Sequence, residues 1–139
     1  MSSHPHFPEF HGLPWHTSLQ EGMRAAAREE KLLFVELSRP TCASCRNLFE
    51  ELLPDPDCAS LLKESFICVS IPSHNPDPQI MEIGAAHMPF ASMLPVCFYL
   101  TADGDFLHGS TGRLDKQVLI ADIRHAKNEA ARLAGAAGG

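Results

Sequence analysis

The chain has 139 residues, 45% of them hydrophobic, a length that supports one compact core rather than two ordinary domains. Its 11 lysines and arginines against 17 acidic residues give a formal charge of −6, which argues against nucleic acid or an anionic membrane surface as a partner. No run reaches the roughly 20 apolar residues that span a bilayer, and the amino-terminal segment lacks the basic and apolar regions of a signal peptide.

Residues 1–14 lack the periodicity of a helix or a strand, and we expect them to form an extended arm. Histidines and prolines are frequent in this arm: His4, His6, His11, Pro5, Pro8 and Pro14. Nothing spaces the histidines for a defined coordination geometry, so a surface segment is the simpler interpretation and metal capture is the alternative.

A helix is predicted from about residue 18 to about residue 30. Ser18 can cap it, and Glu21 lies three residues later in the position that completes a capping box. The next run, Leu32–Leu37, is apolar except for Glu36, which is typical of a strand buried on both faces. A desolvated carboxyl group such as Glu36 could accept a proton, and the alternative is an edge residue turned to solvent.

The rest of the chain continues to alternate between helical and strand patterns. In chain order we expect a helix from Cys42 to Leu53, a short helix over Asp57–Lys63, a strand over Phe66–Ile71, a helical turn near Gln79–Ala86 within a long connection over 72–94, a strand over Pro95–Leu100, a strand over Phe106–Gly109 after a tight turn, and a last helix from near Asp115 to Gly135. This order predicts an α/β fold with a central mixed sheet of four to five strands flanked by helices.

The cysteines are odd in number, which argues against a disulfide framework and favours redox or metal chemistry. They are Cys42, Cys45, Cys58, Cys68 and Cys97. Cys68 and Cys97 lie in predicted strands, where cysteine behaves as a small hydrophobic residue. Cys58, near a helix start, is expected to be exposed and could act as a secondary thiol.

Cys42 and Cys45 form a CxxC motif between a predicted buried strand and a predicted helix. At a helix N-terminus the unsatisfied N–H groups and the helix dipole favour the thiolate form of Cys42. Cys45 lies about one turn further on, near enough to attack a mixed disulfide at Cys42. Zinc sites also use CxxC, but no second pair at matching spacing is present, so a metal or cluster would have to be shared between chains.

From about Trp15 to Leu133 the chain resembles the thioredoxin superfamily. The strand Leu33–Leu37 is similar to the family strand that leads into the redox loop, and Glu36 stands where these proteins often carry a buried acid. Leu94-Pro95 resembles the cis-proline that faces the cysteines. If Pro95 is cis it would fix an extended edge where a substrate strand can pair, whereas an ordinary trans proline at a strand start is the alternative.

One subgroup of the superfamily fits the segment before the first strand especially well. Trp15-His16-Thr17 and the following helix resemble the anterior-gradient-like proteins and, more distantly, the C-terminal domain of the bacterial thiol:disulfide interchange protein DsbD. The chain departs from thioredoxins by having Thr41 in place of tryptophan before the first cysteine and Ala43-Ser44 in place of Gly-Pro. The redox potential therefore cannot be transferred from thioredoxin.

The resemblance implies a thiol–disulfide oxidoreductase without a cofactor. Cys42 would attack, Cys45 would resolve, Glu36 would assist proton movement and Pro95 would position the substrate backbone. The substrate would also be contacted by the residues around these groups, namely Thr41, Ala43, Ser44 and Leu94. No metal ligands are assigned.

We expect the partners to be protein thiols and disulfides together with an upstream redox partner, and the chain to be a monomer that contacts neither nucleic acid nor membrane. The domain is expected to span 15–134, followed by a flexible tail over 135–139. The location is expected to be cytoplasmic, or periplasmic or secreted if a leader has been removed. The alternative function is a non-catalytic binding module that docks through residues 73–94, where Met88, Phe90 and Met93 look exposed.

Overall fold

The computed structural model of the chain describes His4, Phe7 and residues 13–138. Its elements, in chain order, are β1 (Trp15–His16), α1 (Leu19–Glu29), β2 (Leu32–Ser38), α2 (Ala43–Asn47), a π-helical segment η1 (Leu48–Leu52), α3 (Pro56–Ser65), β3 (Phe66–Pro72), α4 (Pro78–His87), β4 (Val96–Leu100), β5 (Phe106–Thr111) and α5 (Lys116–Gly138).

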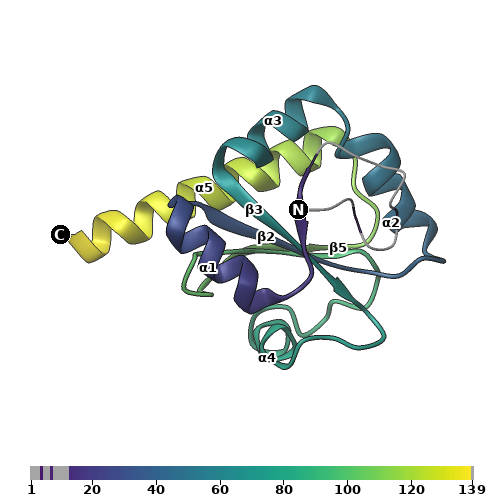
Figure 1. Cartoon of the computed structure of the whole chain (residues 1–139), viewed down its shortest axis with the longest axis horizontal. Helices are drawn as coiled ribbons and strands as arrows, with labels where there is room; N and C mark the ends of the chain where they lie inside the picture. Colours follow the sequence, from purple (N-terminus) through teal and green to yellow (C-terminus); the bar gives the residue numbers. More distant parts are fainter. Residues whose placement is uncertain (1–3, 5–6, 8–12, 139) are drawn as a thin grey trace.

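The strands form one mixed five-stranded sheet in the order β1-β3-β2-β4-β5, which confirms the predicted fold. β3 runs parallel to both β1 and β2, whereas β4 is antiparallel to β2 and to β5. Helices α1 and α4 lie on one side of the sheet, and α2, α3 and α5 lie on the other (Figure 1). β1 was not predicted, because a strand of two residues is too short to show alternation.

The central strand β2 divides its side chains between the two layers. Leu33 and Val35 belong to the core beneath α1, while Phe34 belongs to the core beneath α3 and α5. Glu36 has the same parity as Phe34 and therefore points to the α3 and α5 side. Since β2 lies between β3 and β4, the interpretation of Glu36 as an edge residue is wrong.

The first helix begins as its capping signal predicts. The Ser18 hydroxyl accepts a hydrogen bond from the Glu21 N–H at 3.3 Å. The helix ends at Glu29, and its C-cap residue Glu30 takes the left-handed conformation with a φ of 56° and donates its N–H to carbonyls of the last turn. These two ends set the start of β2 and so the register of Glu36.

Three helices differ in extent from the sequence expectation: the one after Cys42, α4 and the last helix, α5. The helix after Cys42 changes to π-helical geometry over Leu48–Leu52. Where only a turn was expected, α4 is a full helix over Pro78–His87, because Asp77 caps it and a proline is well tolerated in a first helical turn.

The last helix continues past Gly135, its expected end, to Gly138. A single glycine costs a helix only about 1 kcal/mol, and the neighbouring alanines are the best helix formers. Within the described part of the chain, no helix combines the length and the hydropathy needed to cross a membrane.

Candidate active site

Cys42 stands at the start of α2, immediately after the loop that leaves β2. It is the N-cap residue of the helix, and its sulfur accepts a hydrogen bond from the Cys45 N–H at 3.1 Å. Cys42 is partly exposed, and its neighbours Thr41 and Ala43 are exposed. The arrangement presents a partly exposed sulfur atom that faces a backbone N–H donor.

Cys45 is the buried member of the pair, with no exposed surface. The pKa of its thiol is raised to about 12, mainly by burial, with smaller contributions from the hydrogen bond with Cys42 and the charge of Glu36. Both cysteines are free thiols in the structure. A thiol that holds its proton this firmly needs a base before it can attack a disulfide.

Glu36 lies in β2, the strand that precedes the Cys42 loop, and is completely buried. In the strand register it lies opposite Cys97 of β4 and Ser70 of β3. Its Oε1 lies 2.7 Å from Nε2 of His4, whereas its Oε2 has no hydrogen-bond partner among the described residues. One carboxylate oxygen is thus left available to receive a proton.

The amino-terminal arm contributes His4, which the sequence interpretation missed. His4 and Phe7 are buried, so the expectation of a surface segment is wrong at these two positions. Packing explains the difference, because Phe7 stacks on Phe49 and His4 lies against Trp15. Phe7 is an apolar residue whose burial could be suspected from the sequence, but nothing in the sequence indicated that His4 would contact Glu36. His6 and His11, the other two histidines of the arm, lie outside the described residues.

The Leu94–Pro95 peptide bond is cis. Val96, the next residue, pairs with Leu37 near the end of β2, so Pro95 lies at the end of the sheet from which the Cys42 loop departs. The N–H of Gly112 donates to the Met93 and Pro95 carbonyls and ties this loop to the segment after β5. Leu94 packs against the same core cluster as Cys42. Ser44, half-buried in α2, completes the set of predicted contact residues.

The other three cysteines are all buried. Burial raises the pKa of Cys68 to about 12 and raises that of Cys97 still further, as expected for cysteines that serve as core residues. The expectation of an exposed Cys58 is wrong, because this residue lies on the inner face of α3, four residues before the buried Leu62. A second exchange thiol at Cys58 has no access to solvent.

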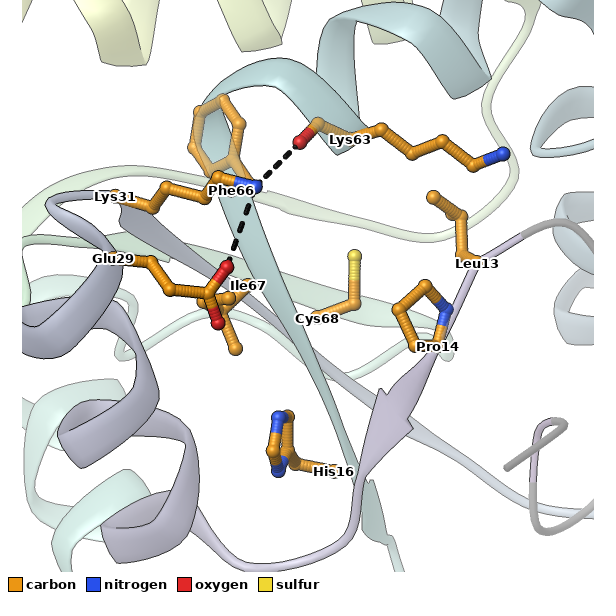
Figure 2. A pocket seen from close by; sticks show the side chains of 9 residues that line it. All are labelled: Leu13, Pro14, His16, Glu29, Lys31, Lys63, Phe66, Ile67 and Cys68. Carbon is orange, nitrogen blue, oxygen red and sulfur yellow. Dashed lines mark hydrogen bonds and ion pairs between the residues drawn. The ribbon is translucent and has the colours of Figure 1, made fainter. Parts of the chain in front are cut away.

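A pocket of about 270 Å³ lies away from these residues, at the end of the sheet where β2 and β3 begin (Figure 2). One of its two lysines is already engaged, because Lys31 Nζ donates to the Lys63 carbonyl at 2.8 Å and lies 3.7 Å from Glu29 Oε1. Across the residues that the structure describes, no group of three or more His, Cys, Asp or Glu side chains is arranged to hold a metal ion.

Residues 14–102 match the family model described as thioredoxin-like. The chain belongs to the thioredoxin-like family. The match covers β1 to β4 and therefore includes the CxxC motif, Glu36 and Pro95. A comparison with curated proteins found no match for this thioredoxin-like chain.

Solved structures with the same fold include known and putative redox proteins. The chain is 17% identical to a thioredoxin from Thermus thermophilus, with a TM-score of 0.65 over 82% of this chain and 86% of that one. A putative disulphide-isomerase from Bacteroides thetaiotaomicron is 18% identical, with a TM-score of 0.66 over 82% of this chain and 90% of that one. The oxidised C-terminal domain of DsbD from Neisseria meningitidis is 19% identical, with a TM-score of 0.57 over 78% of this chain and 95% of that domain. At these identities the similarity shows the fold.

Proposed function

We propose that the protein is a thiol–disulfide oxidoreductase that exchanges disulfides with protein substrates through Cys42 and Cys45. The observation that carries the proposal is the division of labour between the two sulfur atoms. Cys42 is partly exposed and accepts a backbone hydrogen bond, whereas Cys45 is buried one turn away with a raised pKa. An attacking thiolate and a resolving thiol need these two environments.

In the first step the Cys42 thiolate attacks one sulfur of a substrate disulfide. The Cys42–substrate S–S bond forms, the substrate S–S bond breaks, and the other substrate sulfur leaves as a thiolate. The backbone N–H of Cys45 stabilises the Cys42 thiolate before the attack. No redox cofactor is required, because the electron pair moves from sulfur to sulfur.

In the second step Cys45 loses its proton and attacks the Cys42 sulfur. The Cys42–Cys45 disulfide forms and the second substrate sulfur leaves, so the substrate has gained two electrons and the protein has lost them. Glu36 is the proton acceptor in this proposal, since its Oε2 is buried without a hydrogen-bond partner among the described residues. With an oxidised protein and a reduced substrate, the same steps run in reverse.

Substrate contacts are assigned to the surface around Cys42. Thr41, Ala43 and Ser44 flank the reactive sulfur, and Leu94 and Pro95 lie at the same end of the sheet, immediately before β4. A substrate polypeptide that lies along this segment would bring its disulfide over Cys42. The expected partners are therefore protein thiols and disulfides, together with a redox partner that resets the Cys42–Cys45 pair.

The test is the reduction of insulin with dithiothreitol as electron donor. The parent protein is expected to accelerate the reaction, and Cys42→Ser is expected to fall to the uncatalysed rate. A Cys45→Ser variant should accumulate a mixed disulfide with the substrate, visible on a non-reducing gel. A Cys42→Ser variant as active as the parent would exclude the proposal.

A second candidate function is a non-catalytic binding module that docks through residues 73–94. Phe90 is 92% exposed and Met93 is 63% exposed, and a groove of about 230 Å³ between α4 and β4 lies beside this segment. Met88 lines that groove and is half-buried, so the expectation that it is exposed is wrong. Partner binding that survives replacement of both Cys42 and Cys45, in a protein without exchange activity, would favour this candidate.

A further inference from the structure

The amino-terminal arm places a histidine directly on the buried acid of the site. His4 Nε2 lies 2.7 Å from Glu36 Oε1 and 2.9 Å from the Ser70 hydroxyl. Both members of the histidine–carboxylate pair have no exposed side-chain surface. A buried carboxylate is costly unless a donor satisfies it, so this contact determines the state of Glu36.

The direction of the hydrogen bond follows from the other ring nitrogen of His4. The Phe7 N–H donates to His4 Nδ1 at 3.2 Å, and Nδ1 must therefore be unprotonated. A neutral imidazole then carries its one proton on Nε2 and donates it to Glu36 Oε1. A protonated Oε1 would face that N–H proton, so the contact favours the carboxylate form of Glu36 and leaves Oε2 as the oxygen that can take a proton.

The surroundings of the pair support this assignment. Aromatic rings close around His4, with ring-centroid distances of 3.9 Å to Phe49 and 4.8 Å to Trp15. The guanidinium of Arg46, the residue after Cys45, lies 5.1 Å from the centre of the Phe7 ring. These contacts hold His4 and Phe7 against the start of the redox helix and keep solvent from the carboxylate.

The titratable groups that act on Glu36 from the other elements are thiols. They are Cys45 of α2, Cys68 of β3 and Cys97 of β4. The pKa of each is raised by burial first and by the charge of Glu36 as a further cause, so all three hold their protons at neutral pH. These three thiols therefore bring no charge of their own next to Glu36.

We propose that the amino-terminal arm completes the active site, with His4 as a positioning residue that holds Glu36 as a carboxylate whose Oε2 receives the Cys45 proton. The inference rests on the exchange reaction proposed above. In the resolving step the S–H bond of Cys45 breaks, its proton moves to Glu36 Oε2, and the sulfur electron pair forms the bond to Cys42. The substrate leaves as a thiolate, and His4 keeps its own proton throughout.

The test compares His4→Phe, which fills the same space without a donor, with His4→Gln, whose amide can donate from nearly the position of Nε2. The reaction is oxidation of the reduced protein by oxidised glutathione, at concentrations where attack by Cys45 limits the rate. It can be followed by the fluorescence of Trp15, the only tryptophan in the chain. The readout is the pH profile of this rate.

Loss of the donor favours the protonated acid, so in His4→Phe the rising limb of the profile is expected to move to higher pH by about one unit. On that limb the rate should then fall about tenfold, with a smaller loss at higher pH. His4→Gln should return to within about threefold of the parent. His108→Phe, which removes the histidine paired with Asp122 at 2.8 Å, is the matched control and should leave the profile unchanged.

An unchanged pH profile in a folded, active His4→Phe variant would overturn the inference while the exchange function stands. If the parent itself forms no Cys42–Cys45 disulfide, the exchange function fails instead. A measurement that needs neither activity nor a variant separates the two cases. Long-range ¹H–¹⁵N NMR of the parent protein is expected to show the Nε2–H tautomer for His4, and an Nδ1–H tautomer or a solvent-exposed ring would overturn the inference.

Discussion

Among the residues that the structure describes, two histidine–carboxylate pairs have nearly the same geometry in very different surroundings. His4 and Glu36 approach to 2.7 Å with both side chains fully buried, whereas His108 and Asp122 approach to 2.8 Å with 28% and 13% of their side chains exposed. The first pair is shared between the arm and the central strand β2, and the second joins β5 to α5. Position and burial, rather than the contact itself, therefore decide what such a pair can do.

The largest expected difference between the two pairs is in catalysis. Glu36→Gln should slow disulfide exchange at neutral pH by about 100-fold, because a buried thiol loses its proton acceptor. Asp122→Asn should stay within about twofold of the parent, because Asp122 serves no exchange cysteine. The measurement is the rate of insulin reduction by each of the two variants under the same conditions. Equal losses in both variants would show that the acids act through the fold rather than through Cys45.

The next difference is in stability. His4→Ala should lower the free energy of unfolding by about 2 kcal/mol, since it removes a buried hydrogen bond to a charged group. His108→Ala should cost less than about 1 kcal/mol, because its pair is partly exposed to water. Urea unfolding of the reduced proteins tests this order. A larger loss in His108→Ala than in His4→Ala would show that burial does not set the strength of these two pairs.

The smallest expected effect concerns the thiol that shares its surroundings with the buried pair. The folded-state pKa of Cys45 is raised from 9.0 to about 12, mainly by burial. Stability from the protonated thiol is therefore complete below pH 9 and is lost as the pH rises toward 12, because the unfolded chain gives up that proton first. The alkaline loss of stability should be shallower in Cys45→Ala than in the reduced parent. Identical slopes would place Cys45 in a solvent-like environment.

Much of this architecture was predictable because it depends on local patterns. The apolar run over Leu32–Leu37, the Ser18 cap and the CxxC motif each act within a few residues, and they located β2, α1 and the exchange cysteines. The role of Glu36 could be suspected because a single charged residue interrupts a buried strand.

The remainder depends on contacts between distant segments. His4 and Glu36 are 32 residues apart, and a short arm rich in proline shows no periodicity that would place it in the core. The same holds for Cys58, whose position near a helix start suggested exposure but whose face of α3 is decided by packing against the sheet. The change to π-helical geometry after Asn47 has no sequence signal that we can identify.

The proposed function requires Cys42 and Cys45 to form a reversible redox pair, and its most direct test is a titration in glutathione buffers. The fraction of Cys42–Cys45 disulfide is measured by acid quenching, thiol alkylation and peptide mass spectrometry. We expect a single two-electron transition with a midpoint between about −270 and −120 mV, the range of proteins that exchange disulfides. A pair that stays reduced across all buffers, or that oxidises without joining Cys42 to Cys45, would contradict the proposed function.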